Sequence, residues 1–174
     1  MARIPYADYN HPSVKELSDR IIAERGSILH LYQMLMHSGP IAEGWLKYLT
    51  AIRQKTSISG AMRELIIMRV ALLNNAPYEA EQHAPIALQE GVTQDKLDAL
   101  KNWPTSNVFD KNERAILSYT DSMTREIQVP ESIFNEVANI YSNEEIVEIT
   151  ATIAAYNMVS RFLEALQIHS HDER

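Results

Sequence analysis

Three side chains that can transfer protons lie on two neighbouring expected helices. Glu79 and His83 are four residues apart, a spacing that places both side chains on one helix face, one turn apart. Because imidazole titrates near neutral pH, a carboxylate at this distance can orient it or stabilise its charge. Glu64 lies among apolar residues of the preceding expected helix, where a charge needs water or a partner. These residues are therefore candidates for acid–base chemistry.

The same residues admit two other interpretations. A Glu–His pair at this spacing is common on a solvated helix face, where it serves only stability. Two carboxylates and a histidine can also ligate iron or zinc, but di-iron bundles repeat a Glu-x-x-His motif on a second helix. Here the spacing is Glu-x-x-x-His and it occurs once, so we predict neither a metal nor a cofactor.

The elements that must position these residues are helical. Apolar residues recur at helical spacing through most of the chain, strand patterns are absent, and the 5 Gly and 7 Pro lie mainly at segment joints. We predict a single all-α domain of about eight or nine helices. The expected helices cover about 14–25, 28–37, 41–52, 60–73, 77–90, 93–100 and 143–166, with two more that open at Asp110 and Pro130.

Local signals mark the ends of several of these helices. Ser27, Ser59 and Thr93 are expected to open helices, and Gly91 to end one in the left-handed conformation. Pro85 is expected to bend its helix or to shift the helix start. Capping boxes are expected at Asp110 with Glu113 and at Ser142 with Glu145.

Two further expectations concern packing. We expect residues 102–107 to form a loop that Trp103 anchors on the core. We also expect a buried stripe on the third helix, made of Ile41, Trp45, Tyr48, Leu49 and Ile52.

Composition excludes several classes of protein. The 16 Lys and Arg against 23 Asp and Glu give a net charge of −7, which does not suit a nucleic-acid partner. No apolar stretch approaches the ~20 residues of a membrane span, and no export signal is present. The absence of cysteine excludes disulfides, thiolate nucleophiles and thiolate metal sites. A cysteine-free chain fits a reducing compartment, and we expect a cytoplasmic protein.

Two segments resemble a known family. Residues 63–83, with Arg63-Glu64-Leu65 and Asn74 to His83, resemble the core of the carboxymuconolactone decarboxylase family, to which alkylhydroperoxidase D belongs. Residues 156–166 are similar to the closing helix of many members. The resemblance implies an alkylhydroperoxidase D-like helical bundle, with a family-like core at about 40–166, an N-terminal helical extension at about 1–39 and a frayed tail at 167–174.

The peroxidase branch of this family carries a glutamate, a Cys-x-x-Cys pair and a histidine. On this chain the glutamate falls on Glu64, the histidine on His83 and the cysteines on Ala76 and Glu79. Without either thiol, a thiol peroxidase mechanism is chemically excluded. The Tyr-Glu-x-x-x-His form instead looks like the decarboxylase branch, whose members act without a cofactor on γ-carboxymuconolactone in aromatic-acid catabolism.

The resemblance assigns roles to individual residues. His83 would be the general acid or base, Glu79 would orient it, and Glu64 would relay a proton or polarise the substrate. For an acidic small-molecule substrate, Tyr78, Arg69, Asn157 and Arg161 are the predicted binding residues. The resemblance also implies a homo-oligomer, a trimer or a hexamer. The alternatives are a non-catalytic ligand-binding or structural oligomer, and a non-thiol, metal-dependent relative of the peroxidases.

Overall fold

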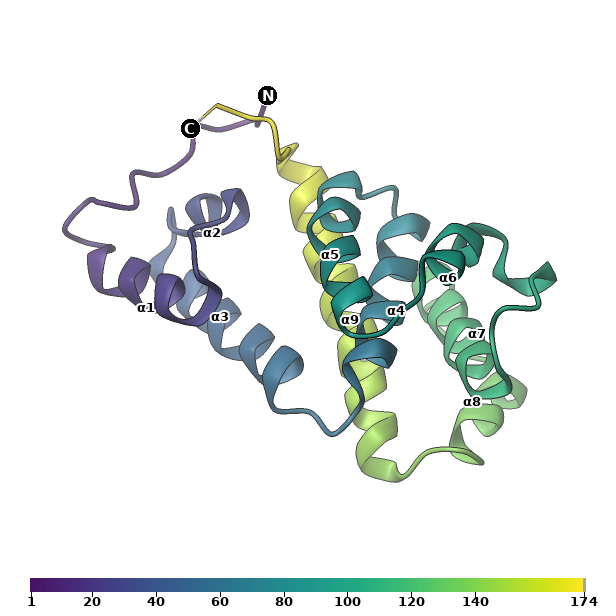
Figure 1. Ribbon diagram of the computed structural model, residues 1–174. Helices are drawn as coiled ribbons and strands as arrows, with labels where there is room; N and C mark the ends of the chain where they lie inside the picture. The colour runs from purple at the N-terminus through teal and green to yellow at the C-terminus, as the bar shows by residue number, and fades with distance from the viewer. Residues whose placement is uncertain (174) are drawn as a thin grey trace. The chain divides into compact units, whose positions relative to one another are not determined.

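The computed structural model describes residues 1–173, which form nine α-helices and one 3-10 helix without a strand (Figure 1). The predicted all-α class and helix number are confirmed. In chain order the elements are α1 (Lys15–Arg25), α2 (His30–Leu35), α3 (Gly39–Gln54), α4 (Gly60–Leu73), α5 (Pro77–Gln89), α6 (Gln94–Ala99), the 3-10 helix η1 (Leu100–Thr105), α7 (Lys111–Arg125), α8 (Glu131–Ala138) and α9 (Asn143–Leu166).

The chain forms two compact units, which we describe separately. The first unit comprises residues 1–55 and 163–174. In it, α3 packs against α1 and α2. The predicted buried stripe of α3 is partly wrong, because Ile41 is 56% exposed and Tyr48 is 43% exposed. Ala42 and Leu46, one residue further round the helix, are buried beside Trp45, Leu49 and Ile52 instead.

The chain after Leu166 leaves α9 and lies against the N-terminal segment of the first unit. The Tyr6 hydroxyl donates to the Asp172 carboxylate at 2.7 Å, and His30 Nε2 lies 3.0 Å from the Asp172 carbonyl oxygen. Ile168 is fully buried. The tail of residues 167–174 was predicted to fray, but its described part, as far as Glu173, is held by these contacts.

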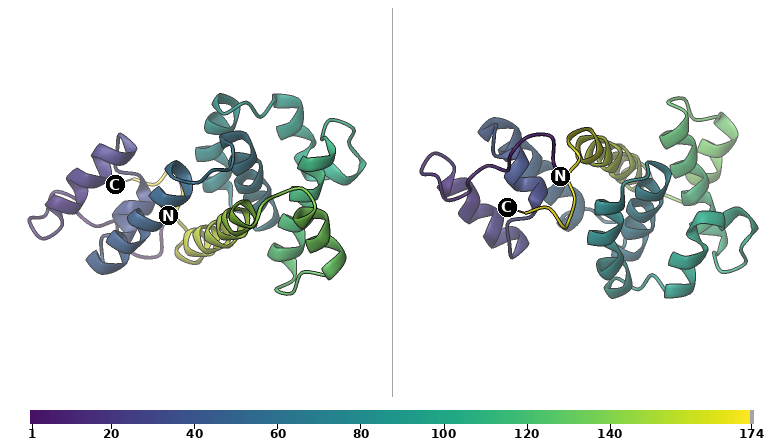
Figure 2. Two further views of the ribbon diagram at one scale, coloured as in Figure 1. Left: turned by 90° about the horizontal axis from the view of Figure 1, so that it is seen from below. Right: turned by 90° about the horizontal axis from the view of Figure 1, so that it is seen from above.

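The second unit, residues 56–162, is built around α4. This helix packs against α5 on one side and α7 on another, and it is buried continuously from Arg63 to Ala71. Helix α8 lies beside α7, as both views in Figure 2 show. A hydrophobic core cluster contains residues of α4, α5, η1, α7 and the connections between them. Its buried members are Leu65, Met68, Ala87, Val92, Leu100, Trp103, Phe109 and Leu117.

Most of the predicted helix ends are confirmed. The Ser59 side chain accepts from the Met62 amide at the start of α4, and Thr93 does the same for Lys96 at the start of α6. Gly91 follows α5 with a φ of +99°. The capping boxes at Asp110 with Glu113 and at Ser142 with Glu145 both form.

Three local predictions are corrected. Ser27 caps no helix, because α2 begins only at His30, and burial of all six of its residues holds it in place. Residues 103–105 are helical rather than a loop, although Asn102 itself has non-helical backbone angles, and Arg114 donates to the carbonyls of Trp103 and Pro104. Trp103 is buried, as predicted. Pro85 lies within α5, which still begins at Pro77, so the predicted shift of the helix start is wrong and the bend stays a prediction.

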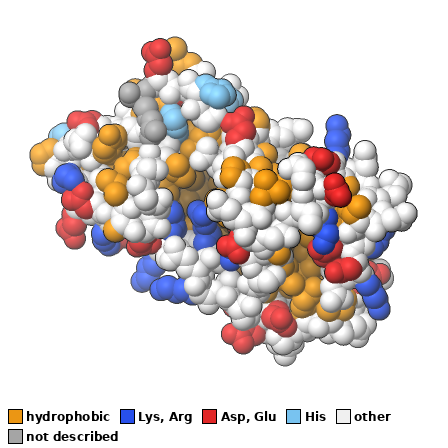
Figure 3. Space-filling model, viewed as in Figure 1, with side chains coloured by type: hydrophobic (Ala, Val, Ile, Leu, Met, Phe, Trp, Pro, Cys, Tyr) orange, Lys and Arg blue, Asp and Glu red, His pale blue; other side chains and the backbone are white. Residues whose placement is uncertain are grey.

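The surface carries charges of both signs. On the face drawn in Figure 3, acidic and basic side chains alternate, and apolar side chains are exposed between them. Between residues 1 and 173, no helix is both long enough and apolar enough to cross a bilayer.

Candidate active site

A tight helical hairpin brings the predicted acid–base residues together. Helix α4 ends at Leu73, Asn75 adopts a left-handed φ of +50°, and Pro77 opens α5. Asparagine tolerates this conformation better than most residues, and proline suits the first turn of a helix. The short connection therefore folds α5 back along α4, so that Glu64 faces His83.

His83 lies between two carboxylates. Its Nδ1 is 2.6 Å from Glu64 Oε2, and its Nε2 is 3.1 Å from Glu79 Oε1. Glu64 is fully buried, and Glu79 and His83 are only 4% and 5% exposed. The Glu–His pair is thus not on a solvated helix face, and the three predicted catalytic residues form one hydrogen-bonded cluster.

Two neighbours complete this cluster. The ring of Tyr156, from α9, meets the His83 ring edge to face, with centroids 5.2 Å apart and an interplanar angle of 89°. Arg63 donates through Nε to Glu64 Oε1 at 3.3 Å and through Nη2 to Glu90 Oε1 at 3.2 Å. Sequence reasoning assigned no site role to Arg63, Glu90 or Tyr156. A signal for Glu90 exists, because it follows His83 by seven residues, two helical turns.

The carboxylates stabilise a protonated imidazole. Burial has the largest single effect on the pKa of His83 and by itself lowers it. The charge of Glu79 and the hydrogen bonds to Glu64 and Glu79 act together in the opposite direction and raise the pKa from 6.5 to about 9. At neutral pH, His83 is therefore an imidazolium whose two N–H groups both donate to carboxylates.

This arrangement bears on metal binding. Within residues 1–173, no group of three His, Asp or Glu side chains is placed to hold a metal ion. A histidine binds a metal through a nitrogen lone pair, whereas both ring nitrogens of His83 face a carboxylate oxygen. The cluster as it stands is suited to proton transfer.

Arg69, a predicted substrate-binding residue, points to a different helix. It forms a two-pronged ion pair with Asp121 on α7, at 2.5 Å for Nε to Oδ1 and 2.7 Å for Nη2 to Oδ2. Its Nη1 donates to the Leu100 carbonyl at 2.9 Å. These partners fasten α4 to α7 and η1, and none of them belongs to the His83 cluster.

The other predicted binding residues are also dispersed. Asn157 donates to Thr124 and to the Ile153 carbonyl, and it accepts from Asn74, each at 3.0 Å. Arg161 is exposed, and between residues 1 and 173 it forms no ion pair. Tyr78 is buried in the first turn of α5, next to Glu79.

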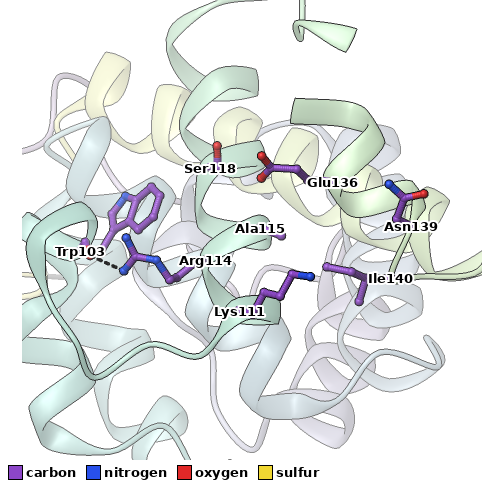
Figure 4. A pocket seen from close by; sticks show the side chains of 8 residues that line it. All are labelled: Trp103, Lys111, Arg114, Ala115, Ser118, Glu136, Asn139 and Ile140. Atoms are coloured by element: carbon purple, nitrogen blue, oxygen red, sulfur yellow. Dashed lines mark hydrogen bonds between the residues drawn. The ribbon is translucent and has the colours of Figure 1, made fainter. Parts of the chain in front are cut away.

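A separate pocket of about 660 Å³ lies between η1, α7 and the end of α8 (Figure 4). In it, the Arg114 guanidinium lies over the Trp103 ring, 5.3 Å from its centroid. Lys111 and Glu136 also line the pocket, whereas Glu64, Glu79 and His83 do not. We place the candidate chemistry at His83, because a buried histidine between two carboxylates is the more specific arrangement.

Comparison with known proteins agrees with the fold. The chain is 25% identical over 115 residues to the uncharacterized protein YdfG of Bacillus subtilis (strain 168), covering 65% of this chain and 78% of YdfG. Its fold is similar to that of an alkylhydroperoxidase AhpD core protein, related to peroxidases, from Ralstonia eutropha JMP134. That match has a TM-score of 0.83 and 16% identity, and it covers 98% of this chain and 93% of the other.

A variant of the debrominase Bmp8 in complex with 2,3,4-tribromopyrrole has the same fold, with a TM-score of 0.82, 19% identity and coverage of 98% of this chain and 94% of that one. Residues 40–122 match the model of the carboxymuconolactone decarboxylase family. The sequence match and the structural matches cover the same hairpin, since residues 40–122 include the helices that carry Glu64, Glu79 and His83. Over this segment the chain is similar to the carboxymuconolactone decarboxylase family, in a form that contains no cysteine.

Proposed function

We propose that the protein is a cofactor-free lyase that decarboxylates a small carboxylated lactone or a related carbonyl acid. The observation that carries this proposal is a buried histidine held in its protonated form by two carboxylates. Such a group can deliver a proton to carbon in a site from which water is largely excluded.

The reaction needs little beyond that proton. When the bond between the substrate carbon and its carboxylate breaks, CO₂ leaves and the electron pair stays on the lactone, where the conjugated carbonyl accepts it. A proton from His83 then adds to carbon and gives the enol-lactone. Buried donors that are already oriented lower the free energy of such charge-separated states without further reorganisation.

The two glutamates have different parts in this scheme. We predicted from the sequence that Glu79 orients His83, but the shorter contact is the one from Nδ1 to Glu64. Glu64 therefore orients the imidazole. Because the contact from Nε2 to Glu79 is longer, we propose that Nε2 gives up its proton and that Glu79 lies beside the substrate. Glu79 stands where the resembling peroxidases carry their second cysteine, so a carboxylate replaces the thiol next to the histidine.

Turnover of γ-carboxymuconolactone, followed as CO₂ release, tests the proposal. We expect His83→Gln to lower kcat by about 100-fold or more, because the proton donor is lost. Glu136→Gln, which changes an exposed carboxylate of the separate pocket, serves as the matched control. A His83→Gln protein that keeps full activity would refute the assignment.

One observation favours a second candidate, a non-catalytic member of the fold that binds a small acid or serves only assembly. Both ring nitrogens of His83 already have a carboxylate partner, and the side chains of Glu64, Glu79 and His83 are almost fully buried. Such a cluster can serve stability alone. Thermal shifts with aromatic-pathway acids, without CO₂ release by the wild-type protein, would support this candidate over the lyase.

A further inference from the structure

We propose that Arg63, held between Glu64 and Glu90, is a positioning residue that sets how strongly His83 holds its proton. Its effect on turnover rests on the proposed function, whereas its effect on the titration of His83 does not. The family resemblance assigns no role to Arg63 or to Glu90.

Arg63 is tied into the cluster by its geometry. Its side chain is about 10% exposed, and its guanidinium bonds one carboxylate on each side. The two carboxylate oxygens of Glu64 have different partners. Oε1 lies 3.3 Å from Nε of Arg63, and Oε2 lies 2.6 Å from Nδ1 of His83. A single buried carboxylate thus lies between two cations, so the charge on Arg63 acts directly on the partner of His83.

Glu90 forms the outer end of this chain of charges. It lies at the end of α5, and its side chain is 42% exposed. Its carboxylate also lies beside Gly60, the first residue of α4, where an added Cβ would overlap it. The start of a helix favours an anion, and the glycine leaves room for this one. Glu90 is therefore held where it can pair with Arg63.

The groups that contact His83 come from three helices. Glu64 lies on α4, Glu79 on α5, and the Tyr156 ring on α9. The other buried arginine of α4, Arg69, pairs with Asp121 of α7. Of these two arginines, Arg63 is therefore the one whose ion pair involves a carboxylate of the His83 cluster.

Because a guanidinium does not lose its proton in proteins, Arg63 acts by charge and not as a proton relay. Its positive charge weakens the hold of Glu64 on the His83 proton. Loss of Arg63 must therefore strengthen that hold. Loss of Glu90 must weaken it, because Arg63 is then no longer partly neutralised. A purely structural role predicts the opposite sign for loss of Arg63, since loosening would move the pKa of His83 down towards its ordinary value of about 6.5. For loss of Glu90 both accounts predict a lower pKa, so the Arg63 variant discriminates between them.

Titration of the His83 ring by NMR, in the whole protein without substrate, separates these cases. We expect Arg63→Met to raise the midpoint by about one pH unit, which is a tenfold change in proton affinity of the coupled Glu64–His83 pair. We expect Glu90→Gln to lower it by a few tenths of a unit, because solvent screens this exposed group. Gly60→Ala displaces the Glu90 carboxylate and should act in the same direction as Glu90→Gln.

Two surface variants are the matched controls. Arg125→Met and Glu126→Gln remove the same charges at exposed positions at the end of α7, and we expect no shift from either. Arg63→Lys keeps the charge and should keep the midpoint close to that of the wild type. If Arg63→Met does not fold, Arg63→Gln, which also removes the charge, is measured in its place, and its midpoint must rise. A lower or unchanged midpoint in folded Arg63→Met, or an upward or absent shift in Glu90→Gln, would overturn the proposal.

The outcome also separates this inference from the proposed function. If the midpoints move as expected but His83→Gln keeps full turnover, the lyase assignment fails and the role of Arg63 in the titration stands. If both hold, the alkaline limb of the pH–rate profile should move upward in Arg63→Met and downward in Glu90→Gln, together with the midpoint.

Discussion

His83 carries its charge inside the second unit, where burial by itself lowers the pKa of a histidine. Glu64 and Glu79 reverse that effect and raise the pKa to about 9. The folded protein therefore binds a proton more tightly at this residue than the unfolded chain does. By linkage, the stability of the fold must depend on the pH at which it is measured.

We expect the free energy of unfolding to fall as the pH rises from about 6.5 to 9. The contribution of protonated His83 is fully present below its unfolded pKa of 6.5 and is lost as the pH passes through its folded pKa of about 9. The loss should be on the order of 3 kcal/mol. Urea unfolding across this range measures it, and the same series on His83→Gln should show a much smaller slope. An equal slope in both proteins would contradict this account.

At the scale of elements, the ion pair between Arg69 and Asp121 fastens α4 to α7. Both side chains are largely buried, with exposed fractions of 5% and 13%. The Asp121 carboxylate also accepts from the Trp103 indole at 3.2 Å, which ties η1 to the same point. The core helix that carries Glu64 is thus held on its other face by this group of contacts.

We expect Arg69→Met to destabilise the protein by about 3 kcal/mol, because it leaves the buried Asp121 carboxylate without its main partner. The folded variant should keep the KM of the wild type, since Arg69 does not face His83. In a double-mutant cycle, Arg69→Met with Asp121→Asn should cost less than the sum of the single changes. A raised KM in folded Arg69→Met would support the predicted role of Arg69 as a substrate-binding residue.

The hairpin and the pairing of Glu79 with His83 could be predicted from the sequence, because turn residues and helical spacing are local signals. The choice between Arg63 and Arg69 could not. Both are arginines on one apolar helix, and only the packing of α5 and α7 decides which of them faces the histidine. The same limit applies to Asn157, whose side chain forms hydrogen bonds with Asn74 after α4 and with Thr124 of α7.

At the scale of the whole molecule, the family resemblance implies a trimer or a hexamer, and α9 offers a surface for it. Val147 is 67% exposed and Met158 is 38% exposed. They are 11 residues apart, about three helical turns, and therefore lie on one face of the helix. Ala154, on the same face, is also exposed. An exposed apolar face of this kind suits contact with a second copy of the chain.

We expect light scattering to give the mass of a trimer or a hexamer, and Val147→Asp and Met158→Asp each to shift the protein towards smaller species. A carboxylate introduced on this face would lose its hydration on assembly without gaining a partner, which costs more than the lost apolar contact alone. Ile127→Asp is the matched control, because Ile127 is fully exposed and belongs to the connection after α7 rather than to α9. A monomeric wild-type protein would contradict the trimer or hexamer that the family resemblance implies. If Ile127→Asp dissociates the oligomer and the α9 variants do not, the interface lies elsewhere on the molecule.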